Sequence, residues 1–185
     1  MKLDAKEIAK PALILFLICL IITACLAGTN LLTKKVIAKE EEKSTQQSRL
    51  LVLPTADTFE KSDRSDICYV GKKSDSVVGY VFTTTAASYG GTIEVMTGID
   101  SDGKISGVTI LSISDTPGLG MNAKKESFLG QYRKGIPENG FEVVKGGNAS
   151  DGQINAITGA TITSKAVTSA VNDAVTEYNK IKGGE

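Results

Sequence analysis

The longest apolar stretch of the chain lies near its start. No charged residue occurs between Pro11 and Thr33, and Lys10 and Lys34 flank the run on either side. A helix rises about 1.5 Å per residue, so residues 11–33 are long enough to cross a hydrocarbon core of about 30 Å. The pattern predicts a transmembrane helix over residues 11–33, preceded by a short polar segment at residues 1–10.

Two other kinds of N-terminal segment share features with this run. A cleaved signal peptide has an apolar core of about 7–15 residues, whereas this run is longer and has no A-x-A-like cleavage site. Residues 22–25, which end in Cys25, have the look of a lipoprotein processing box. The apolar run continues past Cys25 to Leu32, so we expect a retained anchor rather than a cleaved leader.

The rest of the chain alternates short β-type runs with turn residues. Residues 34–55 come first; they are charged and contain no helix breaker before Pro54, which predicts a helical linker. Residues 100–103 read Asp-Ser-Asp-Gly and predict the turn of a β-hairpin. The predicted strands are residues 66–70, 77–82, 91–96, 104–111 and 141–144.

Two further segments have the periodicity of helices. Phe128 and Tyr132 are four residues apart within residues 124–132, which predicts a short helix there. Near the C-terminus, apolar residues recur at three- and four-residue steps until Gly183. These positions are Val167, Ala170, Val171, Ala174, Val175, Tyr178 and Ile181. We therefore expect residues 56–185 to form an α+β domain in which helices pack on an antiparallel sheet.

Composition excludes several kinds of chemistry. The 21 Lys+Arg balance the 21 Asp+Glu, so no overall charge favours nucleic acid. Histidine is absent, which removes the usual general base and most zinc or haem sites. The three cysteines form no CxxC motif, and we expect Cys68 to be a small buried apolar residue. We predict neither catalytic residues nor a metal site in this chain.

The most informative segment comes directly before the C-terminal helix. Residues 158–163 read Thr-Gly-Ala-Thr-Ile-Thr. A helix start has unpaired N–H groups and the positive end of the helix dipole, so it suits a phosphate. Gly159 and Ala160 allow a ligand to approach the backbone, and the threonines supply hydroxyls. The alternative is ordinary N-capping of the helix by Thr163 or Ser164.

Two glycine-containing loops carry weaker signals. Residues 114–120 include Pro117 and Gly118, a pair typical of a type II turn, and Gly120 adds a flexible point. This loop is either a plain connection or a backbone-lined cradle that closes over a flat ligand. Residues 89–91 read Tyr-Gly-Gly, which offers a ring for stacking and close approach of the backbone.

Together and in this order, these segments resemble one family. The N-terminal apolar helix, Tyr-Gly-Gly at 89–91, Thr-Pro-Gly-Leu-Gly at 116–120 and Thr-Gly-Ala-Thr at 158–161 resemble the G subunit of the Rnf complex. That complex is an ion-translocating ferredoxin:NAD oxidoreductase. The chain is also similar to the C subunit of the sodium-pumping NADH:quinone reductase. The resemblance covers nearly the whole chain, and the spacing of the last two motifs is its most specific part.

The resemblance implies a covalently bound FMN. In this family a dedicated flavin transferase takes the FMN moiety from FAD and joins its phosphate to the last threonine of the motif, here Thr161. The resulting phosphodiester would lie beside the helix N-terminus, with Thr158 and Thr163 as hydrogen-bond donors. Without a histidine to activate a threonine, an outside enzyme fits better than self-attachment. The predicted cofactor-binding residues are Thr161, as the attachment point, and Tyr89, Gly91, Thr116, Gly118, Leu119, Gly120, Thr158, Gly159, Ala160, Ile162 and Thr163.

The sequence departs from the family pattern at two positions. Family members carry an aspartate three residues before the Thr-Gly-Ala-Thr motif, and this chain has Asn155, which keeps an oxygen acceptor but loses the charge. Asp115 stands where the family has a glutamate, which is a milder change.

The family also implies a topology that the lysines do not. Three lysines precede the apolar run and three follow it closely, so the positive-inside rule does not choose an orientation. The resemblance implies a cytoplasmic N-terminus at residues 1–10 and an extracytoplasmic FMN-binding domain at residues 56–185. The cytoplasmic membrane, its lipids, the other Rnf subunits and the flavin transferase are the implied surroundings and partners.

The function implied is relay of electrons within a complex that moves electrons from reduced ferredoxin toward NAD and exports Na⁺ or H⁺. An alternative is the equivalent flavin subunit of the NADH:quinone reductase, or a stand-alone extracellular electron-transfer protein. An alternative of another class is an anchored binding module without a redox role, in which Thr161 only caps a helix.

Overall fold

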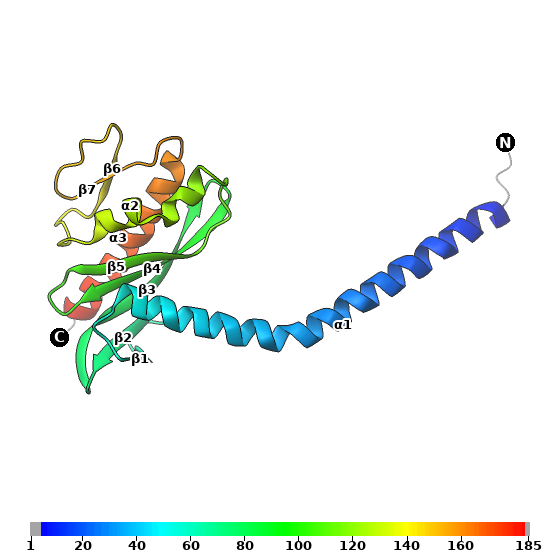
Figure 1. Ribbon diagram of the computed structural model, residues 1–185, viewed down its shortest axis with the longest axis horizontal. Coiled ribbons are helices and arrows are strands. Elements are labelled where there is room, and N and C mark those ends of the chain that lie inside the picture. Colours follow the sequence, from blue (N-terminus) through cyan, green and yellow to red (C-terminus); the bar gives the residue numbers. More distant parts are fainter. Residues whose placement is uncertain (1–4, 184–185) are drawn as a thin grey trace. The chain divides into compact units, whose positions relative to one another are not determined.

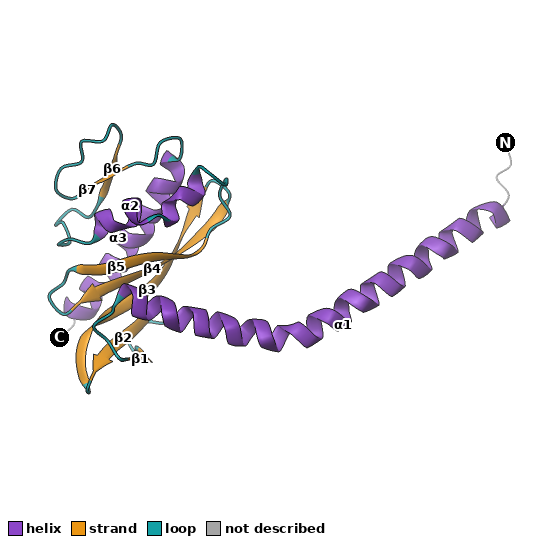
Figure 2. Ribbon diagram, viewed as in Figure 1, coloured by secondary structure: helices purple, strands orange, loops and turns teal. Residues whose placement is uncertain are grey.

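The computed structural model describes residues 5–183 of the chain, and they divide into two compact units that meet between Ser44 and Thr45. A single helix, α1 (Ala5–Val52), forms the described part of the first unit and ends in the second (Figure 1). The linker predicted after the anchor is therefore a continuation of the same helix, which ends two residues before Pro54. Figure 2 shows that the second unit combines strands and helices.

The first unit contains the apolar segment. Within the described residues, one helical segment, Ala9–Lys34, is long and apolar enough to cross a membrane. None of its most apolar window is buried against other parts of the chain. The prediction of an N-terminal apolar helix is confirmed.

The second unit is built on a five-stranded antiparallel sheet in the order β1-β2-β3-β4-β5. Each strand pairs with its neighbour in sequence, so the sheet is a simple meander. The hairpin predicted at residues 100–103 joins β4 to β5, and Gly103 there has a φ of 79°. The strands are β1 (Thr58–Lys61), β2 (Cys68–Lys73), β3 (Ser76–Ser88), β4 (Gly91–Asp100) and β5 (Ile105–Ser112).

The C-terminal helix α3 (Thr161–Gly183) covers one face of this sheet. All seven of its predicted apolar positions are buried, so the predicted helix and its buried face are confirmed. Cys68 lies in the same core and is fully buried, as expected; burial raises the pKa of its thiol to about 11. The α+β class with helices packed on an antiparallel sheet is confirmed.

The other face of the sheet receives the end of α1. Val52 and Leu53 pack there against Val81 and Met96. Ser106 on β5 donates a hydrogen bond of 2.6 Å from its hydroxyl to the carbonyl oxygen of Val52. The sheet is therefore packed on both faces, by α3 on one and by the end of α1 on the other.

The segment between β5 and α3 differs from the predictions. The helix expected at residues 124–132 is split into the 3₁₀ turn η1 (Gly120–Lys124), the helix α2 (Glu126–Leu129) and the 3₁₀ turn η2 (Gly130–Tyr132). The extended backbone of Lys125, with ψ of 142°, interrupts it. Phe128 and Tyr132 still meet, with their ring centroids 5.8 Å apart.

Three strand assignments also change. The strand predicted at 141–144 is β6 (Glu142–Val144), and it pairs in parallel with β7 (Gln153–Asn155), which the sequence did not predict. The edge strand β1 was not predicted either. Both missed strands are short, and β1 is largely exposed, so neither shows an alternating apolar pattern long enough to predict a strand.

Candidate functional site

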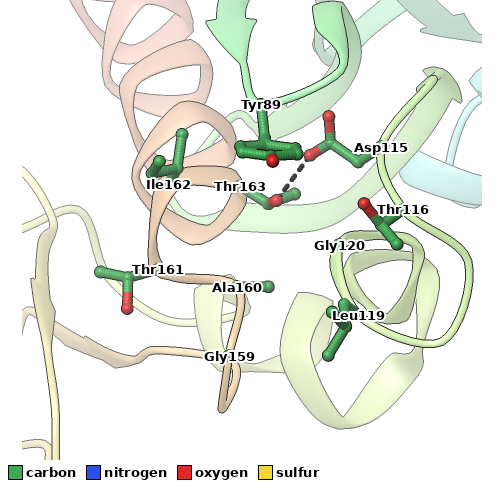
Figure 3. Close-up of a pocket in the computed structure, with 10 residues that line it drawn as sticks. All are labelled: Tyr89, Asp115, Thr116, Leu119, Gly120, Gly159, Ala160, Thr161, Ile162 and Thr163. Atoms are coloured by element: carbon green, nitrogen blue, oxygen red, sulfur yellow. Dashed lines mark hydrogen bonds between the residues drawn. The ribbon is translucent and has the colours of Figure 1, made fainter.

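A pocket of about 430 Å³ opens at the N-terminal end of α3. This volume is within the range of about 300–1,000 Å³ that is usual for cofactor and small-ligand sites. Its walls come from the turn between β3 and β4, the loop that follows β5, and the first turn of α3 (Figure 3). The lining residues are Tyr89, Asp115, Thr116, Leu119, Gly120, Gly159, Ala160, Thr161, Ile162 and Thr163.

Three sequence segments singled out for their chemistry thus meet at one place. Nine of the twelve predicted cofactor-binding residues line the pocket, and the three that do not are Gly91, Gly118 and Thr158. Gly118 instead shapes the loop after β5: its φ is 78°, and the N–H of Leu119 donates to the carbonyl oxygen of Thr116 at 3.2 Å. The turn predicted there is confirmed, and it presents Leu119 to the pocket.

The first turn of α3 supplies free hydrogen-bond donors. The first backbone hydrogen bond of the helix runs from the N–H of Ser164 to the carbonyl oxygen of Ala160, at 3.0 Å. The N–H groups of residues 161–163 therefore have no acceptor within the helix. The positive end of the helix dipole lies at the same place, so this end of the pocket favours a phosphate.

N-capping by Thr163 or Ser164, the alternative role for this segment, is not found. Both residues lie inside the first turn rather than before it, because α3 begins at Thr161. The hydroxyl of Ser164 accepts from the N–H of Ile157 and donates to the carbonyl oxygen of Ala160, both at 2.9 Å. Ser164 thereby fixes the chain that enters the helix and leaves the helix start open.

Gly159 brings that entering chain close to the loop after β5. Its φ of 77° is a conformation that side chains disfavour. A Cβ atom at this position would lie 3.2 Å from Cδ2 of Leu119, closer than ordinary packing allows. A glycine here therefore lets the two loops meet at the floor of the pocket.

Asp115 joins the three segments at the other end of the pocket, and sequence reasoning did not assign it a site role. Its side chain accepts hydrogen bonds from the hydroxyls of Ser88 and Thr163, both at 2.5 Å, and from the N–H of Gly90 at 2.6 Å. Gly90 approaches so closely that a Cβ atom there would overlap with the carbonyl oxygen of Ser114. The only sequence signal was the place of Asp115 directly before the Thr-Pro-Gly-Leu-Gly motif.

The carboxyl group of Asp115 is ionised at neutral pH. Burial alone would raise its pKa, but the hydrogen bonds from Ser88, Thr163 and Gly90 together outweigh burial and leave the pKa below its usual value. A carboxylate can only accept, so the hydroxyl proton of Thr163 is committed to Asp115. This structure therefore gives no support to Thr163 as a donor to a phosphate, because its hydroxyl donates to Asp115 instead.

Three exposed apolar side chains border the pocket. Tyr89 is 72% exposed, Leu119 is 46% exposed and Ile162 is 56% exposed. Figure 3 shows the Tyr89 ring over the part of the pocket that holds Thr163 and Asp115. A flat aromatic ligand in the pocket would cover this exposed apolar surface.

Thr158 and Asn155 lie in a different depression. They line a hollow of about 380 Å³ together with residues of η1, α2 and η2. The backbone N–H of Asn155 donates to the side-chain oxygen of Gln131 at 2.7 Å, and the Asn155 side-chain oxygen is buried without a partner among the described residues. Neither residue lines the pocket at the start of α3, so the role of Thr158 as a phosphate donor has no support in this geometry.

The pocket thus offers free N–H donors and a hydroxyl at one end, and apolar surface with an acceptor at the other. These features fit a phosphorylated ligand that carries a flat ring. Residues 88–176, which lie in the second unit and include the pocket, match the FMN-binding domain family. Residues 1–51 match the RnfG N-terminal region.

Relatives along the whole length identify the family more closely. The chain is 36% identical to the G subunit of the Na⁺-translocating ferredoxin:NAD⁺ oxidoreductase complex of Acetobacterium woodii, over 97% of this chain and 96% of the relative. It is 35% identical to the G subunit of the proton-translocating ferredoxin:NAD⁺ oxidoreductase complex of Clostridium ljungdahlii, over 90% and 89% of the two chains. The chain belongs to the family of G subunits of ion-translocating ferredoxin:NAD⁺ oxidoreductase complexes.

The fold also has a counterpart of known structure. The crystal structure of Shewanella oneidensis NqrC aligns with a TM-score of 0.54 over 73% of each chain, at 19% sequence identity. At that identity the likeness concerns the fold alone.

Proposed function

We propose that this chain relays electrons through an FMN that is covalently attached to Thr161 within an Rnf-type ferredoxin:NAD⁺ oxidoreductase. The observation that carries the proposal is the state of Thr161. It is the first residue of α3, it lines the pocket, and its hydroxyl has no hydrogen-bond partner among the described residues. A free hydroxyl beside three free N–H groups is the arrangement that an attached phosphate requires.

Attachment forms a bond between Oγ of Thr161 and the phosphorus of the FMN moiety of FAD. The bond from that phosphorus to the AMP portion breaks, AMP leaves, and the threonine proton passes to the enzyme that catalyses the transfer. No side chain among the described residues is hydrogen-bonded to Thr161 as a base, which supports transfer by a separate flavin transferase.

Bound FMN supplies reversible acceptance of one or two electrons. The chain's own residues supply binding and orientation. The N–H groups of residues 161–163 would offset the charge of the phosphodiester, Leu119 and Tyr89 would supply apolar surface for the ring, and Asp115 holds the loops together. Nine of the predicted binding residues take part in this site; Gly118 acts through the turn, and Gly91 and Thr158 lie outside it.

Location supports a covalent bond. The apolar helix Ala9–Lys34 would cross the cytoplasmic membrane. Residues 1–10 would then lie in the cytoplasm, and the flavin domain, residues 56–185, would lie outside the membrane. An FMN that dissociated outside the cell would be lost, whereas an esterified one stays. The side of the membrane follows from the family resemblance and not from the lysines.

The partners would be the other subunits of the complex, membrane lipid and the flavin transferase. Relatives of nearly equal identity are named for Na⁺ and for proton translocation, so either ion fits the coupling. The quinone-reductase alternative is less well supported: the Rnf G subunits match at 36% and 35% identity over 97% and 90% of this chain, whereas two NqrC structures match at 19% and 28% over 73% and 61%. A non-redox module is disfavoured by the match to the FMN-binding domain family.

The test is intact-mass and peptide-mapping analysis of the full chain from its native membrane. We expect an increment equal to FMN less one water, on the peptide that contains Thr161. Thr161→Ala should lose the increment, while Thr176→Ala, which removes an exposed hydroxyl of α3 outside the motif and the pocket, should keep it.

Two results would contradict the proposal. The first is a wild-type chain that lacks the increment although it was produced together with an active flavin transferase. This result would contradict covalent attachment of FMN, and Asn155, which replaces the family's aspartate, would be the first residue to mutate. The second is a Thr161→Ala chain that keeps full electron transfer, which would contradict electron relay through an FMN attached to Thr161. A mature chain beginning at a lipidated Cys25 would contradict the transmembrane anchor instead.

A further inference from the structure

Asp115 is the only charged residue among the ten that line the pocket. It is 3% exposed, and its three hydrogen-bond donors are neutral: two hydroxyls and one backbone N–H. No lysine or arginine in the described part of the chain forms an ion pair with it. The pocket therefore contains a buried negative charge without a counter-charge.

This carboxylate and the attachment residue lie on different sides of the pocket. In Figure 3, Thr161 lies at one side of the group of lining residues, whereas Asp115 lies beside Tyr89 at the other. A phosphate is attracted to the free N–H groups at the Thr161 side and repelled by the carboxylate. The two ends therefore direct the phosphate toward α3 and leave the Asp115 side to the rest of the ligand.

We propose that Asp115 is a positioning residue that assembles the pocket and keeps a negative charge beside the bound flavin ring, which lowers the reduction potential of the flavin. This inference rests on the proposed function, since it concerns the FMN expected in this pocket. The hydrogen bonds from Ser88, Gly90 and Thr163 support a role of Asp115 in assembling the pocket. The absence of a paired cation among the described residues supports its electrostatic effect on the flavin.

The electrostatic effect has a definite sign. An electron added to FMN bound here brings negative charge near the carboxylate unless a proton accompanies the electron. Like charges repel, and a buried charge is screened less than one in water. Reduction is therefore less favourable with Asp115 ionised than with a neutral residue of the same shape.

The test is a redox titration of the flavin-loaded full chain in detergent, followed by flavin absorbance. Asp115→Asn keeps the size of the side chain and one oxygen acceptor but removes the charge. We expect its midpoint potential to rise, with the equilibrium constant for one-electron reduction increasing about tenfold, or about 59 mV. Asp115→Glu retains the negative charge, so its midpoint potential should stay close to that of the wild type.

A matched control removes the same charge elsewhere. Asp63 is exposed in the connection between β1 and β2, so Asp63→Asn should leave the potential unchanged. A potential for Asp115→Asn equal to the wild-type value would overturn the proposal, as would an Asp115→Glu potential as high as that of Asp115→Asn. A wild-type chain that carries no flavin would instead contradict the proposed function.

A second variant covers the case in which Asp115→Asn does not retain flavin. Ser88→Ala removes one donor and keeps the carboxylate. We expect an unchanged potential together with faster hydrogen exchange at the amide of Gly90 in the flavin-free chain. A rise in potential in Ser88→Ala would show that loosening of the pocket, rather than charge, controls the potential, and would overturn the electrostatic part.

Discussion

The two ends of the pocket differ in how their hydrogen-bonding groups are satisfied. At the start of α3, the N–H groups of residues 161–163 and the hydroxyl of Thr161 have no acceptor among the described residues. At Asp115, one carboxylate takes three donors. The first end is incomplete without a ligand, whereas the second is complete without one. The comparison separates the residues that bind from the residue that holds the binding site together.

The two ends also differ in how the chain builds them. The Thr161 end comes from one continuous segment, which Ser164 fixes through Ile157 and Ala160. The Asp115 end needs partners that are 27 and 48 residues away in sequence. A change at the first end should therefore alter ligand binding with little effect on folding, and a change at the second should alter both.

The largest effect is expected when an acceptor side chain is placed at the start of α3, where the N–H groups of residues 161–163 are unpaired. Ala160 directly precedes α3, at the N-cap position, and lines the pocket. In Ala160→Asp the new carboxylate would accept from the free N–H groups and occupy the phosphate site. We expect loss of most of the covalent flavin, measured by intact mass, and a gain of about 0.5–2 kcal/mol in the unfolding free energy of the flavin-free chain.

Ala160→Val is the steric control for that change. It enlarges the same side chain without an acceptor, so it should give no gain in stability. Normal flavin loading of Ala160→Asp would show that the start of α3 does not hold the phosphate.

A smaller effect is expected when the Asp115 carboxylate, the acceptor at the other end of the pocket, is removed. Asp115→Ala leaves the hydroxyl of Thr163, which is buried, and the donors of Ser88 and Gly90 without their acceptor. We expect the flavin-free full chain to lose about 1–3 kcal/mol of unfolding free energy in urea. Thr161→Ala should change it by less than about 0.5 kcal/mol, because that side chain makes no hydrogen bond among the described residues. Equal losses in the two variants would remove the distinction between the ends.

The smallest effect is a dependence on pH. The folded pKa of Asp115 is lower than its usual value of 3.8, so the ionised form is favoured by folding. The resulting stability is present above pH 3.8 and is lost as the pH falls through the folded pKa. Urea midpoints of the wild type and Asp115→Asn should therefore converge as the pH falls below that value. A difference that stays constant from pH 7 to acid would contradict an ionised Asp115.

Local patterns were enough to predict most of the frame and one end of the site. The periodicity from Val167 to Ile181 specified the buried face of α3, and the Pro117-Gly118 pair specified the turn that presents Leu119. The motif at residues 158–161 indicated the free helix start. Each of these features depends on residues that are close together in sequence.

The features that were missed depend on distant partners. The role of Asp115 follows from contacts with Ser88 and Thr163, which no local pattern encodes. The same contacts explain why the structure does not support a donor role of Thr163 toward a phosphate: its hydroxyl donates to a residue 48 positions away. The strand β7 forms because it pairs with β6, although its three residues carry little strand signal of their own.

The hydrogen bonds of Asp115 also bear on the order of events in the life of the protein. The meander of β1 to β5 joins neighbours in sequence, so its strand pairing depends on local contacts that can form early in folding. Thr163 is made only after that sheet, and its bond to Asp115 requires the sheet, the loop and α3 to have docked. The pocket at the start of α3 is therefore completed late in folding, after the sheet that supports it.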